Sequence, residues 1–170
     1  GTRVTSMRRL LALPLLCLPL QAADLLPGHS LHGEAFDAGP RQAAVLIEDC
    51  GKVNFPVTTK NPDAQKFFNQ GVGQLHGFWY FEAERSFRQV AMLDPDCAMA
   101  YWGCAMANAN NAKRAAGFIK KAAEKKGKAS KREQAWISAL EAFHADEKKE
   151  KKTRQMDFIK ATEDIVSDYP

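Results

Sequence analysis

The sequence lacks the residue patterns on which most catalytic and cofactor sites depend. It contains no Cys-x-x-Cys-His haem-attachment site, no glycine-rich phosphate loop and no Gly-x-Ser-x-Gly nucleophile turn. Of its four histidines, only His29 and His32 lie close together. A zinc site needs three or four converging ligands, so this pair alone does not predict one. We therefore expect a protein that is not an enzyme and that binds neither a metal nor another cofactor.

Cysteine is also scarce, which limits what disulfide bonds can contribute. Three cysteines lie beyond residue 23: Cys50, Cys97 and Cys104. Cys97 and Cys104 fall on one predicted helix, roughly 10 Å apart along its axis, which is too far for a disulfide. Cys50 could reach one of them only if the N-terminal segment folds back. Disulfide pairing stays open, although cysteines of this kind often serve as small apolar core residues.

The first 23 residues read as a leader. Met-Arg-Arg at residues 7–9 precedes an almost wholly apolar run from Leu10 to Leu20, and small residues follow at Ala22 and Ala23. This pattern is typical of a cleaved secretory signal peptide, and the run is too short to span a bilayer. We expect an exported protein, periplasmic or extracellular, with an uncleaved anchor as the alternative.

Charge is nearly balanced overall but segregated along the chain. The 24 Lys and Arg exceed the 20 Asp and Glu by four, and three of the arginines belong to the leader. The basic character is therefore no argument for nucleic-acid binding. Residues 113–154 hold 14 cationic against 6 acidic residues. A solvated face of Lys-rich helices explains this excess, and attraction to an acidic partner or membrane surface is the alternative.

Residues 24–61, here called the arm, differ from the rest because glycine and proline interrupt them. The segment from Val53 to Thr59 is short and rich in β-branched residues, with Pro56 inside. A proline excludes a central strand, so we expect an extended arm or an edge strand. Residues 42–49 fit either a short helix or a short strand.

Helical signals begin at Asn61, a good N-cap followed by Pro62 at the first helical position. Ser130 and Glu133 form a capping box that starts a later helix. We expect Gly77 to permit the first turn, and helices at residues 62–76, 80–93, 97–109, 112–126, from 130 onward and 151–168. The last helix should turn four apolar residues inward: Met156, Ile159, Ile165 and Val166.

A 34-residue period runs through these helices. Phe67-Phe68 is echoed by Tyr101-Trp102 and by Ala135-Trp136, and small residues recur at Gly71, Ala105 and Ala139. Such a period is typical of stacked helical hairpins that bury their apolar faces only against one another. We therefore predict an all-α fold of tandem antiparallel helix hairpins, with units at about 62–95, 96–129 and 130–170.

The first unit resembles a tetratricopeptide repeat (TPR), because bulky, small and proline residues occupy the positions of that motif: Phe67, Gly71, Ala83, Phe87 and Pro95. The second unit matches at Tyr101 and Ala105 but needs a two-residue deletion to align Ala115 and Ile119. The third is looser. Residues 67–107 and 29–42 are also similar to exported bacterial proteins with such repeats, planctomycete examples nearest. The resemblance implies a right-handed α-solenoid over residues 62–170, further repeats after Pro170 in a longer parent, and no assigned activity.

Repeat arrays of this kind mostly bind other proteins on a concave surface lined by the first helix of each pair. We expect Gln70, Gln74, Asn108 and Asn110 to be exposed there, because side-chain amides can bond a peptide backbone of any sequence. Ordinary polar surface is the alternative for each of them. The aromatic run Phe78 to Phe81 lies at a predicted turn, where we favour cover by the arm over an exposed, adhesive patch.

The sequence thus predicts a secreted or periplasmic interaction module, or scaffold, with a protein or peptide ligand and no nucleic acid. One alternative is the docking section of a larger exported enzyme or metal protein whose active part lies beyond Pro170. A third hypothesis is association with the cell-envelope surface through the Lys-rich middle, although membrane binding is not expected once the leader is cleaved. The oligomeric state is not predicted.

Overall fold

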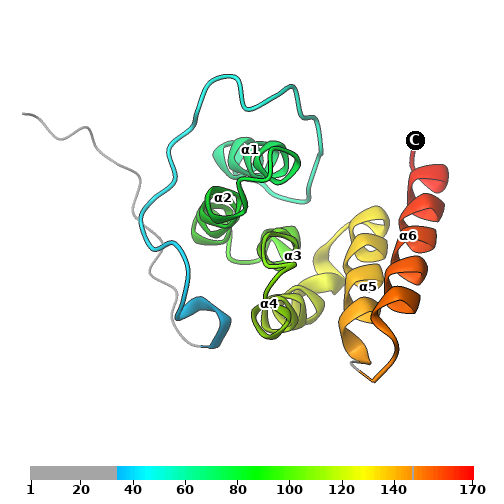
Figure 1. Ribbon diagram of the computed structural model, residues 1–170. Coiled ribbons are helices and arrows are strands. Elements are labelled where there is room, and N and C mark those ends of the chain that lie inside the picture. Colours follow the sequence, from blue (N-terminus) through cyan, green and yellow to red (C-terminus); the bar gives the residue numbers. More distant parts are fainter. Residues whose placement is uncertain (1–33, 147) are drawn as a thin grey trace, which may run out of the picture.

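The structure, a computed structural model of the 170-residue chain, describes residues 34–146 and 148–170. Within them the chain is all-helical and has no strand, which confirms the predicted fold class at this level. The described residues form six α-helices and two short 3₁₀ turns, one at the start of the described arm and one between α4 and α5. Figure 1 shows how the helices are arranged. Their bounds are η1 Glu34–Phe36, α1 Pro62–His76, α2 Tyr80–Leu93, α3 Ala98–Ala107, α4 Ala112–Lys125, η2 Lys126–Lys128, α5 Lys131–Ala145 and α6 Lys151–Asp168. The predicted signal peptide, His29 and His32 lie outside the described residues.

Local sequence signals set the helix starts. The Asn61 side chain accepts hydrogen bonds from the backbone N–H of Asp63 at 3.0 Å and of Ala64 at 3.2 Å. Ser130 and Glu133 form the expected capping box at α5. Each cap satisfies N–H groups that lack partners within the first helical turn, so these helices begin where a side-chain acceptor is available.

The helices pack as three successive pairs, α1 with α2, α3 with α4, and α5 with α6. Neighbouring pairs meet through α2 against α3 and α4 against α5. Phe87 of α2 is fully buried between α1 and α3. A Cβ atom built on Gly71 would lie 2.7 Å from its ring, and one built on Gly103 would lie 2.3 Å away. Glycine on both flanking helices therefore lets three helices close around a single aromatic ring.

Helix α6 does not bury the face that its sequence suggests. Met156 is 57% exposed and Ile159 46%, and Val166 is exposed as well, whereas Ile165 is buried. The expectation that all four point inward is wrong, because α5 is the one helix of the described chain with substantial packing against α6. A helix with a single neighbour buries a narrow stripe and leaves the rest of its apolar surface in water.

The turn between α1 and α2 also differs from expectation. Gly77 has an ordinary φ of −82°, and the residue in the left-handed region is Phe78, with φ at 62°. Trp79 N–H donates to Gln74 O at 2.9 Å and Phe78 N–H to Leu75 O at 3.1 Å. These two bonds form a Schellman motif, whose left-handed position is usually glycine. The motif aims the Phe78 side chain outward.

The predicted cover of this turn by the arm is wrong as well. Phe78 is 76% exposed, and Trp79 and Phe81 are more than half exposed. The arm crosses other parts of α1 and α2, because its hydrogen-bonding partners lie along those helices rather than at their joint. The aromatic run therefore forms an exposed tip.

Candidate functional site

The arm curves round α2 and α1 and returns on the side of α1 that faces α5 (Figure 1). Along residues 53–59 the side chains alternate, with Val53, Phe55 and Val57 partly buried and the residues between them exposed. That alternation is the geometry of an extended chain with one face against a surface. No strand forms in the described part of the arm, so the alternative of an edge strand is not realised. Residues 42–49 form neither of the two structures considered for them.

Side-chain amides of the helices hold the backbone of the arm. Gln65 accepts from Val57 N–H at 2.9 Å and donates to Phe55 O at 2.9 Å. Gln70 does the same with Ile47 N–H at 2.8 Å and Val45 O at 3.0 Å. Gln65 and Gln70 thus each bridge the C=O of one arm residue and the N–H of the residue two further on. These contacts recognise an extended backbone and carry little information about its side chains.

Two further amides extend this pattern. Asn69 accepts from Phe55 N–H at 3.2 Å, and Gln89 of α2 accepts from Ala44 N–H at 3.2 Å. The arm has no sheet partner, so its N–H and C=O groups depend on such side chains or on water. Helices α1 and α2 therefore act as a receptor for the chain's own extended segment.

Phe55 anchors the arm in an aromatic pocket built by three helices. Its ring centroid lies 5.5 Å from that of Phe68 on α1, 6.2 Å from Trp102 on α3 and 6.0 Å from Trp136 on α5. The three pocket residues are 34 positions apart, so the sequence period places one aromatic ring from each helix pair at the same point. The Arg132 guanidinium sits 4.4 Å from the Phe55 ring centroid and closes the outer side.

The pocket leaves one donor unsatisfied. Trp102 is 5% exposed, and its indole N–H has no hydrogen-bond acceptor within the described part of the chain. A buried donor without an acceptor costs about 1–3 kcal/mol. The described residues packed around Trp102, the arm included, therefore leave this donor without an acceptor.

A buried charge cluster holds the beginning of the described arm. Glu84 on α2 pairs with Arg88 at 2.7 Å and accepts from Arg114 on α4 at 2.9 Å. Arg88 donates to Phe36 O and Ala38 O, and Arg114 donates to Ala35 O at 3.0 Å and Ala38 O at 2.7 Å. One carboxylate thus orients two guanidinium groups, whose remaining N–H donors bind arm carbonyls.

The other end of the arm joins the start of α5. Thr58 N–H donates to Glu133 Oε1 at 2.7 Å, and its hydroxyl donates to Glu133 Oε2. Ser130 N–H in turn donates to the Thr58 hydroxyl at 3.2 Å. Glu133 therefore serves both the capping box and the arm, although 75 positions separate it from Thr58.

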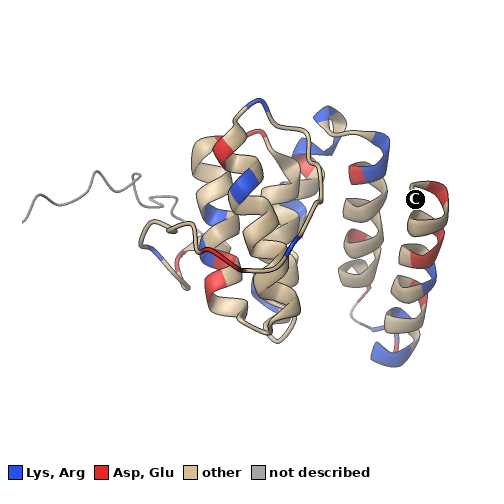
Figure 2. Cartoon of the chain, turned by 90° about the horizontal axis from the view of Figure 1, so that it is seen from above, with Lys and Arg blue, Asp and Glu red and all other residues tan. Residues whose placement is uncertain are grey.

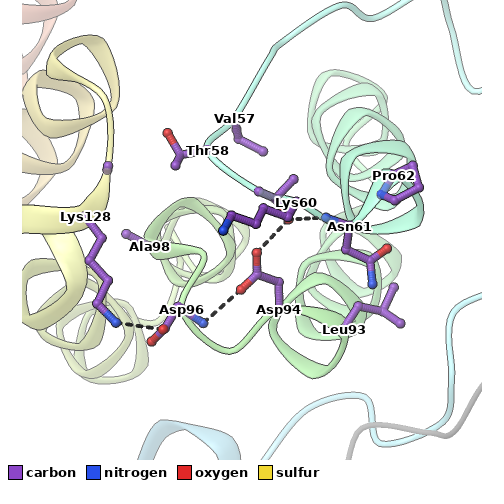
Figure 3. Close-up of a pocket in the computed structure, with 12 residues that line it drawn as sticks. Val57, Thr58, Lys60, Asn61, Pro62, Leu93, Asp94, Asp96, Ala98 and Lys128 are labelled. Atoms are coloured by element: carbon purple, nitrogen blue, oxygen red, sulfur yellow. Dashed lines mark hydrogen bonds and ion pairs between the residues drawn. The ribbon is translucent and has the colours of Figure 1, made fainter.

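A cleft of about 800 Å³ opens beside this joint and is lined by polar residues that bind one another (Figure 3). Asp94 accepts from the Thr59 hydroxyl at 2.6 Å and from Asp96 N–H at 3.2 Å. Lys128 pairs with Asp96 at 2.7 Å, and this bond lowers the pKa of the Asp96 carboxyl. The carboxylates already have partners, so we interpret the cleft as a structural joint between the arm and the α2–α3 turn.

The structure places three of the four predicted binding residues in the interior. Gln70 is 7% exposed, Gln74 3% and Asn108 6%, so their expected exposure is wrong. Gln74 accepts from the Ser86 hydroxyl at 2.7 Å, and Asn108 donates to Glu84 at 2.9 Å. Asn110 is exposed just beyond α3. The chemistry predicted for these amides does occur at Gln70, but its ligand is the arm of the same chain.

Sequence reasoning missed several other residues that hold the arm: Gln65, Asn69, Arg88, Gln89, Arg114, Arg132 and Glu133. For the residues on α1, the sequence contained a pattern that indicates this role. Gln65, Asn69 and Gln70 are spaced so that they share one side of a helix whose other side is apolar. Beside an arm with period-two alternation, a row of amides indicates a surface that binds extended backbone.

A second, open groove lies between α3, α5 and α6, with a volume of about 560 Å³. Its lining is mostly apolar, and the larger side chains among the lining residues are Met106, Leu140, Phe143, Met156, Phe158 and Ile159. Lys151, Lys152, His144, Gln155 and Asn110 also line it. The described part of the arm does not line this groove.

The cysteines of the described chain are thiols: Cys50, Cys97 and Cys104 form no disulfide. Burial raises the pKa of Cys97 to about 12 and raises that of Cys104 as well. A thiol held protonated is a poor nucleophile and a poor metal ligand. Among residues 34–146 and 148–170, no group of three His, Cys, Asp or Glu side chains could hold a metal ion. No helix in these ranges is long and apolar enough to cross a membrane.

Comparison of the chain with protein-family models, with curated proteins and with solved structures gives no match.

Proposed function

We propose that this chain is an exported interaction module of the tetratricopeptide-repeat kind, which binds a protein or peptide and performs no chemistry of its own. One observation carries the proposal: the face shared by α1, α3 and α5 already holds an extended segment, the arm. It does so through amide bridges to the backbone and an aromatic pocket at Phe68, Trp102 and Trp136. A surface that binds an extended chain within the molecule has the chemistry to bind one from a partner.

The arm and a partner would compete for this surface. The arm satisfies the glutamines but leaves the Trp102 indole N–H without an acceptor in the described chain. A partner segment that offers a carbonyl there would recover part of the cost of that unsatisfied donor. Because the arm is tethered, it competes at a high effective concentration, and binding should be weak until the arm loosens.

A matched pair of substitutions on α1 tests the proposal. A Cβ atom on Gly73 would lie 2.1 Å from the backbone carbonyl oxygen of Cys50, so Gly73→Ala should push the arm away. Gly77→Ala meets no atom closer than 3.5 Å and serves as the control. Both changes are made within or next to α1, and alanine favours the helix over glycine.

The measurement is selection of peptides from a random display library on the wild-type chain and on both variants. We expect Gly73→Ala to retain extended peptides at least about tenfold more strongly than Gly77→Ala, because less competition must be overcome. A free peptide copying residues 52–60 should compete with the selected peptides. If none of the three proteins retains peptides above background, the proposed function is wrong.

A further inference from the structure

The groove between α3, α5 and α6 has the properties of a docking site. Met156 and Ile159 form one wall, three residues apart on the same side of α6, and both are about half exposed. Leu140 and Phe143 of α5 and Met106 of α3 complete the apolar lining. Methionine side chains at two positions give the surface an adaptable shape. Soluble proteins rarely leave such a concave apolar surface open without a partner for it.

The lining determines the conformation of the occupant. The arm, an extended chain, needs Gln65, Asn69 and Gln70 to satisfy its backbone. The groove offers amides only at Asn110 and Gln155 among its lining residues. An extended segment seated there would leave many N–H and C=O groups unpaired against apolar side chains, whereas a helix satisfies them internally. The groove therefore favours an amphipathic helix.

The charges at the groove determine the polar face of that helix. Lys151 and Lys152 are exposed and line the groove, and none of the described lining residues is acidic. Figure 2 shows Lys and Arg gathered at the start of α6 and Asp and Glu nearer its end. The first turn of α6 has no acidic residue and no side-chain cap. Glu150 occupies the N-cap position. Cations in the first turn still face the positive end of the helix dipole, which is unfavourable for stability and indicates another use for Lys151 and Lys152.

We propose that this groove binds an amphipathic helix of a partner protein, with apolar residues toward Met106, Phe143 and Ile159 and acidic residues toward Lys151 and Lys152. The proposal rests on the proposed function, since it specifies one class of partner for an interaction module. It concerns a surface separate from the one occupied by the arm, so the two can be tested independently.

The probe is a fluorescein-labelled synthetic helix of about 18 residues, long enough to form a stable helix on binding. It carries leucine at i, i+3, i+4 and i+7 and glutamate at most other positions. One control peptide has the same composition in scrambled order, and a second has lysine in place of glutamate. Fluorescence anisotropy with the full chain should give micromolar binding of the acidic helix, weaker binding at high ionic strength, and little binding of either control.

Four exposed positions of α6 provide three matched variants. Met156→Glu should weaken binding of the acidic helix at least about tenfold, because it puts a like charge on the apolar wall. Val166→Glu, on the same helix but outside the groove lining, should leave binding unchanged. The double variant Lys151→Glu with Lys152→Glu should lose the acidic helix and gain the lysine peptide. Each position is exposed, so folding of the variants is retained and can be checked by circular dichroism.

Three results would overturn the inference: equal binding of the scrambled peptide, no effect of Met156→Glu, or no charge reversal in the double lysine variant. A fourth is a dimer of the free chain that Met156→Glu dissociates in sedimentation, because the occupant would then be a second copy. If Gly73→Ala retains peptides in the selection but the acidic helix does not bind at the groove, this inference is wrong and the proposed function stands. If the peptide selection described above also fails, the proposed function is wrong as well.

Discussion

Phe78 at the α1–α2 turn and two cysteines in the core show how the surrounding structure sets the state of a single residue. Phe78 occupies a left-handed position that glycine normally fills, and its side chain projects into water. Cys97 and Cys104 lie inside, where burial keeps both thiols protonated. Phe78 thus follows the backbone rather than its own conformational preference, whereas the two cysteines serve as small apolar core residues.

Phe78→Gly should raise the free energy of unfolding by about 1 kcal/mol, because glycine adopts a left-handed φ without a Cβ clash. The ring of Phe78 contacts that of Tyr80 at 6.3 Å, an exposed pair whose loss costs little. Urea denaturation measures the change. Phe78→Ala is the control, since it removes the ring but keeps the strain, and it should bring no gain. Equal stability of the two variants would contradict a strained Phe78.

Alkylation should distinguish the cysteines. Iodoacetamide at pH 8 should modify the half-buried Cys50 in the folded chain and should modify Cys97 and Cys104 only after unfolding. Peptide mapping by mass spectrometry locates the label. Rapid labelling of Cys104 in the native chain would argue against this packing.

The same burial makes stability depend on pH. The ordinary pKa of a thiol is near 9, and that of Cys97 in the folded chain is about 12. Above pH 9 the unfolded chain therefore releases thiol protons that the folded chain keeps, so the free energy of unfolding should fall as the pH rises.

At the scale of elements, the arm has no hydrogen-bonded ladder of its own and depends on the helices for its conformation. Its anchor is Phe55, which touches one ring from each helix pair. Helix α6 has a related dependence, because it packs on one neighbour and exposes half of its apolar residues. Both elements are bound through one face, and both should open before the pairs α1–α2 and α3–α4.

Phe55→Ala should release the arm while the helices persist. Full burial of a phenylalanine contributes about 1.5–3 kcal/mol, so loss of the half-buried ring should raise the open population of the arm by about tenfold. Trypsin cleavage after Lys52, measured by mass spectrometry, should accelerate by that factor. Asn54→Ala, at an exposed neighbouring position, should leave the rate unchanged. The helical signal in circular dichroism should be the same for both variants, and a loss of helix in Phe55→Ala would contradict a separately bound arm.

At the scale of the molecule, one carboxylate joins the arm, α2 and α4. Glu84 orients Arg88 and Arg114, which reach the carbonyls of residues 35–38. Glu84→Gln should destabilise the whole chain by about 3 kcal/mol, because it leaves two largely buried guanidinium groups without their counter-ion. The change is measured as a fall in the urea midpoint.

The control for that change lies on the same helix. Glu82 pairs with Arg85 at 2.9 Å and is 41% exposed, so Glu82→Gln should cost less than about 1 kcal/mol. Similar losses in the two variants would mean that the cluster around Glu84 has no special role.

The sequence predicted local features well and long-range ones poorly. Asn61 and Ser130 cap the helices as expected, and α1, α2 and α6 have the predicted bounds. The 34-residue period also marks the three positions that form the Phe55 pocket, although nothing in it shows what fills that pocket. Contacts such as Thr58 to Glu133 span 75 positions and leave no periodic signal. The burial of Gln70 and Asn108 was missed for this reason, since it depends on the arm and on a charge cluster drawn from separate helices.

The Phe55 pocket has a consequence for the order of assembly. The arm is synthesised before the helices, yet the pocket for Phe55 is incomplete until Trp136 has been synthesised. Until then the growing polypeptide carries an arm whose Phe55 ring lacks its third aromatic neighbour, although α1 and α2 already offer their amide groups to its backbone. Full docking of the arm is therefore a late step of folding, which is possible only after the chain has been synthesised beyond Trp136.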